Sequence, residues 1–416
     1  ETPDATITGY IVVNSGKMNV VLRSFKITGW GSTYPAVDDQ GAYQLLIDGV
    51  TFDDGTGQGK PAILVSGSGY QPEVRNCTFI MDNTAQPVIQ LAGGMNAKIH
   101  DNQVIGSGAK PAYFVYIYKD ATTAVSYPGL EVWNNVINYA DRFIVVGTVT
   151  GTQLVNAVIR DNDAGVLALD TDGDYAIDLR GSTNVQILRN RFTIIGTDDT
   201  QYGIYVAGAN VTIQGNTITA GSANAEDLIY IASGGTNAVV EGNTLDARLG
   251  GSGCNGVETA ATNTIIRGNT ILGTNGASAI NVASGATNAV IEANTVGNVK
   301  NADAISIAAT NARISGNTID GVTGSGADAV YLTAGNAEVL NNTIKNVDDG
   351  VGIYVSGVMN NTIQGNTLEN IGRDGILLDT ANADNNTVKG NTLKKVALRA
   401  VVQTATDPAI GDYAAI

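Results

Sequence analysis

The sequence predicts an all-β fold, a single-stranded right-handed parallel β-helix, which is a solenoid of about fifteen coils. One phrase recurs at steps of roughly 25 residues: an aliphatic residue, two variable residues, Asn, usually Thr, and a second aliphatic residue. Examples are IQGNTI at 213–218 and IRGNTI at 266–271. A second phrase, aliphatic–variable–aliphatic, lies about ten residues earlier, as in IYV at 204–206 and ISI at 305–307. No helical periodicity interrupts these strands, and a leucine-rich repeat would need a Leu framework and a helical segment.

The Asn of the first phrase predicts a ladder between successive coils. Asn tolerates the left-handed turn conformation, and its amide can bond the coils above and below when identical residues stack about 4.8 Å apart. Three upstream coils carry the same frame with Phe25, Val50 and Cys77 at this position. The predicted ladder residues are Asn102, Asn135, Asn162, Asn190, Asn216, Asn243, Asn269, Asn294, Asn317, Asn342, Asn366 and Asn391.

The repeat predicts one β-helix over residues 1–400, followed by an irregular C-terminal tail at 401–416. Two irregular segments are expected to protrude as loops. The first, residues 108–130, is long and rich in Tyr and Phe, and the second, residues 170–181, is acidic and rich in Gly. Long loops on rigid scaffolds often carry function.

The charge balance excludes some partners. The net charge is −16, with 23 basic and 39 acidic residues, and no Lys/Arg cluster is present to neutralise phosphates. We therefore expect no binding to nucleic acid, and the lack of a long apolar run predicts no membrane insertion. An acidic surface suits an extracellular setting. Cys77 and Cys254 lie far apart along the repeat and are not expected to pair.

An acidic residue precedes several aliphatic–variable–aliphatic phrases and predicts a cation site. Stacked coils would bring Asp303, Asp328, Asp349 and Asp374 into one column, and Asp227 occupies a similar position upstream. Like charges one coil apart repel, so Ca²⁺ could bind this column as a cofactor. The alternative is that these are turn residues whose carboxylates accept backbone N–H bonds.

The variable residue of the same phrase points outward, and it is Tyr in several coils. Tyr205, Tyr230, Tyr331 and Tyr354 are therefore candidate carbohydrate-binding residues, because exposed rings stack on sugar rings. The alternative is that Tyr packs across neighbouring coils as an ordinary outward strand residue. The aromatic segment AYFVYIY at 112–118 is a second candidate surface.

The repeated GNTI phrases and the DGI-type strands resemble the pectin-lyase-like superfamily of right-handed β-helices. Within it the chain looks most like the repeat regions of bacterial and archaeal surface, adhesin or S-layer proteins. The superfamily also contains pectate lyases, polygalacturonases, alginate lyases, epimerases and tailspike depolymerases, so the resemblance implies a role with carbohydrates. The fold is shared by several functions, and the site must decide among them.

The enzyme motifs of that superfamily are mostly missing. The one histidine, His100, stands in AKIHDNQV and not in a Gly-His-Gly motif, and the Asp-Pro-His-Glu motif of the epimerases is absent. DDGVGIYV at 348–355 matches only the Asp-Asp part of the polygalacturonase pattern. A lyase would need Ca²⁺ and a basic residue, and Arg373 with Asp349 and Asp374 could serve.

These observations favour a non-catalytic, extracellular cell-surface protein with a structural or adhesive role. Its expected partners are surface polysaccharide or neighbouring copies of itself in an oligomer or array. The alternatives are a Ca²⁺-dependent polysaccharide lyase or depolymerase acting on acidic glycans, and a carbohydrate-binding module.

Overall fold

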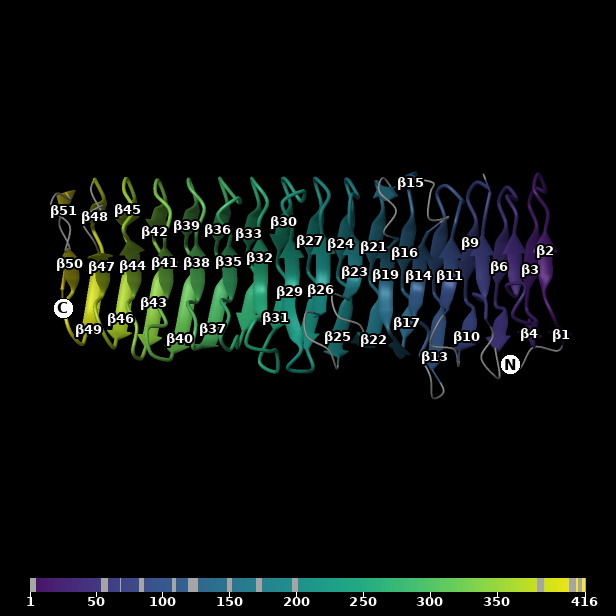
Figure 1. The fold of residues 1–416 in the computed structure, drawn as a ribbon, viewed down its shortest axis with the longest axis horizontal. Coiled ribbons are helices and arrows are strands. Elements are labelled where there is room, and N and C mark those ends of the chain that lie inside the picture. Colours follow the sequence, from purple (N-terminus) through teal and green to yellow (C-terminus); the bar gives the residue numbers. More distant parts are fainter. Residues whose placement is uncertain are drawn as a thin grey trace. The chain divides into compact units, whose positions relative to one another are not determined.

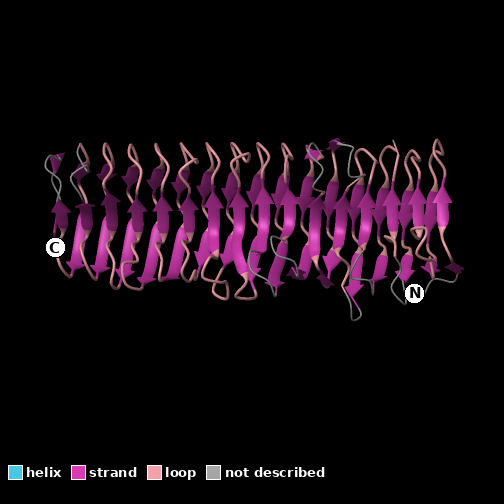
Figure 2. Cartoon of the chain, in the orientation of Figure 1, coloured by secondary structure: helices cyan, strands magenta, loops and turns pink. Residues whose placement is uncertain are grey.

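The computed structural model describes residues 5–53, 59–67, 69–81, 86–106, 110–118, 126–147, 152–169, 174–196, 201–379, 385–403, 409–410 and 414–415. The chain divides into two compact units, Glu1–Thr212 and Ile213–Ile416, which are described separately. The described residues form strands and turns without a helix (Figure 2).

The first unit is a stack of coils in which each coil adds strands to three parallel sheets (Figure 1). Sheet 1 contains β2 (Ile11–Val13), β5 (Val37–Asp39), β8 (Ile63–Val65), β11 (Pro87–Leu91), β14 (Tyr113–Ile117), β19 (Arg142–Val146), β23 (Tyr175–Leu179) and β26 (Gln201–Val206). Sheet 2 contains β3 (Val21–Arg23), β6 (Leu46–Asp48), β9 (Glu73–Arg75), β12 (Lys98–His100), β16 (Glu131–Trp133), β21 (Val158–Arg160) and β24 (Gln186–Leu188). Sheet 3 contains β1 (Thr6–Thr8), β4 (Lys26–Thr28), β7 (Thr51–Asp53), β10 (Thr78–Met81), β13 (Gln103–Gly106), β17 (Val136–Ile137), β18 (Tyr139–Ala140), β22 (Asp163–Leu169) and β25 (Arg191–Gly196). A small additional sheet pairs β15 (Ser126–Pro128) with β20 (Gln153–Val155).

The second unit repeats this arrangement, and β27 (Thr212–Gln214) spans the division between the units. Its part of sheet 1 contains β29 (Ala225–Ile231), β32 (Asn255–Thr259), β35 (Ile280–Val282), β38 (Ile305–Ile307), β41 (Val330–Leu332), β44 (Ile353–Ser356), β47 (Ile376–Asp379) and β50 (Val401–Gln403). Its part of sheet 2 contains β30 (Val239–Glu241), β33 (Ile265–Arg267), β36 (Val290–Glu292), β39 (Arg313–Ser315), β42 (Glu338–Leu340), β45 (Thr362–Gln364), β48 (Thr387–Lys389) and β51 (Ala409–Ile410). Its part of sheet 3 contains β28 (Thr217–Ala220), β31 (Thr244–Asp246), β34 (Thr270–Leu272), β37 (Thr295–Lys300), β40 (Thr318–Thr323), β43 (Thr343–Val347), β46 (Thr367–Ile371), β49 (Thr392–Val396) and β52 (Ala414–Ala415). The predicted parallel β-helix is confirmed.

Inward aliphatic side chains stack in register and form the core of each unit. In the second unit Ile280, Ile305, Val330 and Ile353 follow one another along sheet 1 and are fully buried. Because every coil covers the apolar face of its neighbour, the core extends as long as the repeat continues. This periodic burial explains why strands of only a few residues are sufficient.

The predicted Asn ladder is confirmed in both units. In the second unit Asn294 Nδ2 donates to Asn317 Oδ1 at 3.0 Å and to the carbonyl of Ile266 at 2.9 Å. In the first unit Asn102, Asn135 and Asn162 make the same bonds between successive side chains at 2.9 Å. Each buried amide therefore satisfies backbone groups at a turn that no strand partner reaches.

A second, exposed amide ladder was not foreseen from the sequence. In the second unit Asn288 Nδ2 donates to Asn263 Oδ1 at 3.1 Å, and Asn311 Nδ2 donates to Asn288 Oδ1 at 3.2 Å. Their φ angles, 58°, 62° and 62°, lie in the left-handed region that Asn tolerates better than most residues. The signal was available, because Asn263, Asn288 and Asn311 each follow Thr and stand two residues before a strand of sheet 2.

Two segments expected to be loops contain strands. Residues 113–117 form β14 and residues 175–179 form β23, both within sheet 1. Residues 119–125 and 170–173 of those segments lie outside the described residues. At the other end, β50, β51 and β52 pair with β47, β48 and β49, so strand pairing continues beyond the expected boundary at residue 400.

Cys77 and Cys254 are both free and buried. Burial raises the pKa of the Cys77 thiol to about 12 and raises the pKa of the Cys254 thiol as well. Both residues therefore act as small apolar core side chains.

In the part of the chain that the structure describes, no helix has the length and apolarity to cross a bilayer.

Candidate functional site

The outer face of sheet 1 carries two adjacent columns of side chains. In β14, Phe114 and Val115 are consecutive and both buried, so simple alternation is interrupted between Tyr113 and Tyr116. Tyr113 and Tyr116 consequently share the outer face, with ring centroids 4.5 Å apart. In the second unit the same spacing brings Asn255 Nδ2 within 3.0 Å of Glu258 Oε2. Residues three apart in β14 and in β32 therefore share the outer surface of sheet 1.

In the first unit these columns assemble an aromatic and charged surface, here called the aromatic face. Its residues lie in β14, β19, β23 and β26, which follow one another in sheet 1, or directly after these strands (Figure 1). They are Tyr113, Tyr116, Tyr118, Arg142, Tyr175, Asp178, Arg180, Tyr202 and Tyr205. The rings pack in two groups, with Tyr116 and Tyr118 stacked at 5.3 Å and Tyr175 and Tyr202 stacked at 5.3 Å.

Gly147 permits the close packing of one of these rings. A Cβ atom at Gly147 would lie only 2.6 Å from Cδ2 of Tyr118. Real Cβ atoms do not approach other atoms so closely, so a larger residue would displace the ring. The glycine at the end of β19 therefore shapes the aromatic face.

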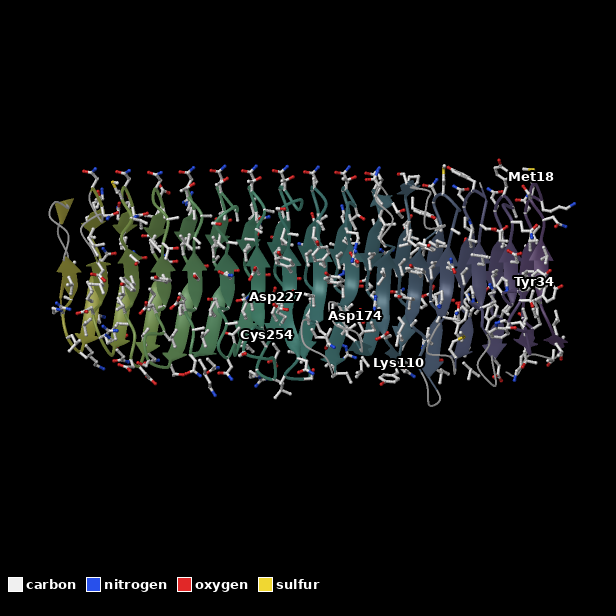
Figure 3. The ribbon with its side chains drawn as sticks, in the orientation of Figure 1. Met18, Tyr34, Lys110, Asp174, Asp227 and Cys254 are labelled. Atoms are coloured by element: carbon white, nitrogen blue, oxygen red, sulfur yellow. The ribbon has the colours of Figure 1, made fainter. Side chains whose placement is uncertain are left out.

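Two arginines lie between the rings, and each is paired with an aspartate. The Arg142 guanidinium lies 5.2 Å from the centroid of the Tyr113 ring and forms an ion pair with Asp174. Figure 3 labels the position of Asp174. Arg180 Nε donates to Asp178 Oδ2 at 2.7 Å, and its guanidinium lies 5.5 Å from the centroid of Tyr175. Ion pairing and stacking together fix both guanidinium groups in place.

Burial controls the ionisation of this surface. Desolvation raises the pKa of Asp178, while the bonds from Arg180 oppose this shift. Burial also raises the pKa of Tyr116 to about 12 and raises the pKa values of Tyr113 and Tyr205. At neutral pH the three phenols are therefore O–H donors beside fixed guanidinium donors.

The predicted tyrosines are divided among different surroundings. Tyr205 belongs to the aromatic face, 4.5 Å from Tyr175. In the second unit Tyr331 and Tyr354 are neighbours in register, with centroids 5.2 Å apart, and the Tyr354 hydroxyl donates to Asp379 Oδ2 at 2.8 Å. Tyr230 lies in β29, where the next residue along the column is Glu258. The outward direction of the column is confirmed, and the use of these tyrosines in binding stays a prediction.

The predicted acidic column is only partly formed, and Asp349 is not a member of it. The register of sheet 1 aligns Val330, Ile353 and Ile376, so the residues two positions earlier are Asp328, Val351 and Asp374. Asp349 stands four residues before Ile353 and is exposed. Val351 therefore occupies the place that the sequence analysis gave to Asp349.

The remaining carboxylates of the column accept bonds from neighbouring coils. Asp303 Oδ1 accepts the backbone N–H of Asp328 at 2.9 Å, and Asp328 Oδ1 accepts that of Val351 at 2.7 Å. Asp374 accepts from Arg399 Nε and Nη2 at 2.9 and 3.0 Å. Burial raises the pKa of Asp328 to about 7, with Asp303 adding to the shift and Arg373 opposing it. Among the described residues there is no group of three or more His, Cys, Asp or Glu placed to hold a metal ion.

The family model described as "Right handed beta helix region" matches residues 142–319 and 254–408 of the chain. No curated protein matches the chain significantly.

Among solved structures, the chain is similar to the A-module of the mannuronan C-5 epimerase AlgE6 of Azotobacter vinelandii, with 13% identity and a TM-score of 0.35, over 99% of this chain and 91% of that one. It is also similar to PfbA, a surface adhesin of Streptococcus pneumoniae, with 12% identity and a TM-score of 0.43, over 86% of this chain and 85% of that one. A PL6 alginate lyase solved with a trisaccharide has 12% identity and a TM-score of 0.28, over 97% of this chain and 80% of that one. At these identities and TM-scores the likeness decides nothing about the activity of this chain.

Proposed function

Since the chain belongs to the right-handed β-helix family, we propose that it is a non-catalytic extracellular surface protein that binds polysaccharide on the aromatic face of its first unit. The observation that carries this proposal is the packing of Tyr113, Tyr116, Tyr175 and Tyr205 around the ion-paired guanidinium groups of Arg142 and Arg180.

The chemistry of the aromatic face suits sugars. Tyrosine rings offer apolar surface to the C–H faces of a pyranose, while phenol, guanidinium and carboxylate groups bond its hydroxyls. The groups are already held in place by one another, as Arg180 is by Asp178. A preorganised surface loses little conformational entropy when a ligand binds.

Binding is favoured over elimination chemistry by the state of the arginines. Arg142 and Arg180 are both paired with carboxylates, which orient their guanidinium groups as hydrogen-bond donors. A lyase would need a base able to accept the proton beside a uronate. The alternative lyase at Asp374 and Arg373 is less favoured, because Asp374 is occupied by Arg399.

The test is affinity gel electrophoresis on a panel of acidic and neutral polysaccharides, with alginate, polygalacturonate and xylan in separate gels. We expect retardation by at least one polymer, lost in the double variant Tyr116→Ala, Tyr205→Ala. The matched control is Tyr331→Ala, Tyr354→Ala in the second unit, which should keep the retardation. Release of unsaturated uronate, detected by its ultraviolet absorbance, would establish the lyase instead.

Calcium binding and self-assembly belong to the same proposal. Asp303 and Asp328 are the carboxylates that succeed each other along sheet 1, and a bound cation would relieve their repulsion. Electron microscopy of the purified protein with millimolar Ca²⁺ and with EDTA tests both ideas. Arrays that dissolve in EDTA would support calcium-dependent assembly, and separate particles in both conditions would remove it.

A further inference from the structure

The first coils of the first unit carry a stripe of exposed apolar side chains that the fold does not require. Met18, Tyr43, Tyr70 and Met95 form successive β-bridges, one residue per coil. Their exposed fractions are 66%, 43%, 41% and 49%. Exposed apolar groups that line up in this way mark interaction surfaces far more often than singly scattered ones.

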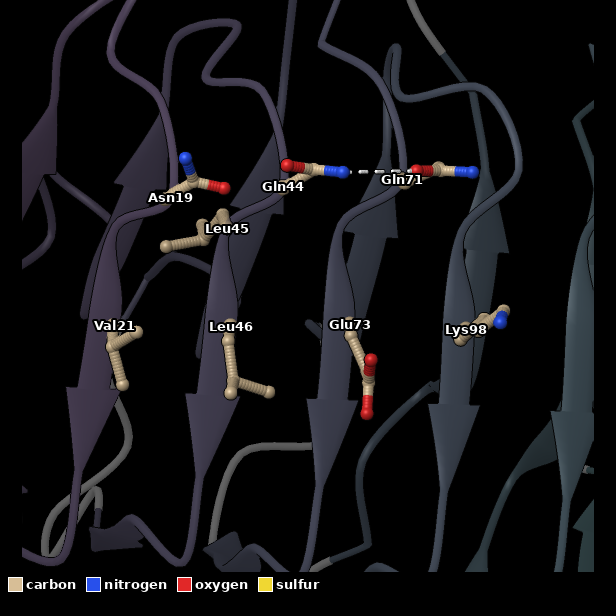
Figure 4. A pocket seen from close by; sticks show the side chains of 8 residues that line it. All are labelled: Asn19, Val21, Gln44, Leu45, Leu46, Gln71, Glu73 and Lys98. Carbon is tan, nitrogen blue, oxygen red and sulfur yellow. Dashed lines mark hydrogen bonds between the residues drawn. The ribbon is translucent and has the colours of Figure 1, made fainter.

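A row of amides follows this stripe. Each residue of the stripe is followed by Asn19, Gln44, Gln71 or Asn96, and Gln44 Nε2 donates to Gln71 Oε1 at 3.4 Å (Figure 4). Gln44 and Gln71 both have φ of 57°, in the left-handed region. Glutamine adopts this conformation less readily than asparagine, so its presence at two successive turns calls for a compensating role.

The amide row forms one wall of a groove on the outside of the unit (Figure 4). The other wall consists of the first residues of β3, β6, β9 and β12, which stand in register. They are Val21, Leu46, Glu73 and Lys98, and Leu45 also lines the groove. The groove therefore repeats with the coil spacing of about 4.8 Å and presents one amide and one strand residue per coil.

Other coils show which residues occupy the same turn where no groove is formed. Further along the first unit the residue before the left-handed Asn is Val155, Thr183 or Ala209. Within the second unit it is Thr262, Thr287 or Thr310 in three coils, and Met359 is an exposed apolar exception. Small residues and Asn are thus sufficient for the turn, and the unbroken run of Met and Tyr side chains, with two Gln residues after them, is particular to the first coils.

The groove is polar but has little free charge. Glu73 accepts a bond from Arg75 at 2.9 Å and lies 3.2 Å from His100 Nε2, so Arg75 of its own strand balances its charge. Lys98 stands at one end of the strand row. The groove offers few charged groups to pair with a highly charged ligand. Its regular row of amide donors and acceptors can instead form hydrogen bonds with hydroxyl groups.

We propose that this groove is a second carbohydrate site, which binds a linear, uncharged polysaccharide running along the stack with about one sugar ring per coil. Tyr43 and Tyr70 supply ring faces at the rim, and Gln44 and Gln71 bond the hydroxyls. The site lies on a different part of the unit from the aromatic face and does not depend on it.

A peptide strand suits the groove less well than a sugar chain. Strand addition needs free backbone groups at a sheet edge. Here the backbone N–H groups of Tyr43, Gln44 and Gln71 already donate to the carbonyls of Lys17, Tyr70 and Met95 at 2.7 to 2.8 Å. Only side chains are therefore available to bind a ligand. Their spacing along the groove is close to the length of one sugar ring.

The experiment is isothermal titration of the whole chain with cellohexaose, xylohexaose and mannohexaose, with a uronate hexamer as the charged comparison. We expect at least one neutral hexamer to bind better than the uronate. Tyr43→Ala with Tyr70→Ala should weaken that binding at least about ten-fold. Gln44→Asn with Gln71→Asn, which shortens the amides while favouring the turn, should also weaken it without lowering the melting temperature.

Two control variants make the outcome decisive. Thr262→Ala with Thr287→Ala changes the same turn in the second unit and should have no effect. Tyr116→Ala with Tyr205→Ala should leave this binding intact, so loss of the aromatic face and loss of the groove are distinguishable. Failure of all three neutral hexamers to bind overturns the proposal, as does binding that survives both groove variants. Dimerisation abolished by Tyr43→Ala with Tyr70→Ala would instead assign the stripe to contact between copies.

Discussion

Arg180 and Asp178 form a side-chain pair within one strand and its turn, with Arg180 Nε donating to Asp178 Oδ2 at 2.7 Å. The same guanidinium lies 5.5 Å from the ring centroid of Tyr175 and 6.0 Å from that of Tyr205. Asp178 is almost wholly buried, so its carboxylate depends on Arg180 for compensation. Arg180 therefore contacts both the buried Asp178 carboxylate and the Tyr175 and Tyr205 rings of the aromatic face.

Replacing Arg180 with Lys should weaken polysaccharide binding several-fold while preserving the charge. An ammonium group cannot present the planar fork that stacks on Tyr175 and Tyr205 and bonds Asp178. Affinity electrophoresis on the polymer that retards the wild type measures the effect. Arg191→Lys is the matched control, because Arg191 pairs with Asp163 at an exposed site outside the aromatic face. Equal binding by wild type and Arg180→Lys would remove the arginine from the site.

Replacing the ladder residue Asn294 with Ala should lower the free energy of unfolding by roughly 2–4 kcal/mol. The backbone N–H of Asn269 and the carbonyl of Ile266 would lose their partner in a buried turn. Denaturant unfolding followed by circular dichroism gives the value. Asn288→Gly in the exposed ladder keeps a residue suited to φ of 62° and should cost less than about 1 kcal/mol. Similar losses for both variants would contradict the structural role assigned to the buried ladder.

The stability of the protein should fall as pH rises from about 4 to 7, and Asp328 should contribute to this fall. Its pKa is raised from 3.8 to about 7 in the folded chain, so in this window the folded state holds a proton that the unfolded state has lost. Asp328→Asn should therefore flatten the curve by up to about 1.4 kcal/mol per pH unit. The asparagine can still accept the N–H of Val351, which limits other effects. Urea unfolding at half-unit pH steps provides the comparison, and unchanged slopes would rule out the shift.

Arg399→Ala should destabilise the last coils of the second unit, because it leaves the buried Asp374 carboxylate without its bidentate partner. Hydrogen exchange of the peptides containing β47 and β50 should increase, with little change near β32. The double variant Arg399→Ala, Asp374→Asn should recover part of the loss. No recovery would mean that Arg399 acts through packing alone.

The repeat made the fold predictable, because Asn294 and its equivalents recur in one phrase and each has one geometric role. The site was harder to foresee. Tyr113, Arg142 and Tyr175 each stand two residues before an aliphatic–variable–aliphatic phrase, at a position that the phrase does not define. Their grouping depends on the interruption of side-chain alternation between Tyr113 and Tyr116. Sequence alternation alone would place those two residues on opposite faces.

The position of Asp349 could have been corrected from the sequence. Asp328 and Asp374 each stand two residues before the inward aliphatic residue that begins the strand, whereas Asp349 stands four residues before Ile353. Counting two residues back from Ile353 gives Val351, not Asp349. The pairing of Asp374 with Arg399 follows from the same count, since Arg399 precedes Val401 by two.

The most direct test of the central claim is the affinity of the wild type and of Tyr116→Ala, Tyr205→Ala for the polysaccharide that retards the wild type, measured by isothermal titration. The account predicts an affinity at least about ten-fold weaker in the variant, with unchanged circular dichroism and no release of unsaturated product. An unchanged affinity in a folded variant would contradict a binding role for the aromatic face.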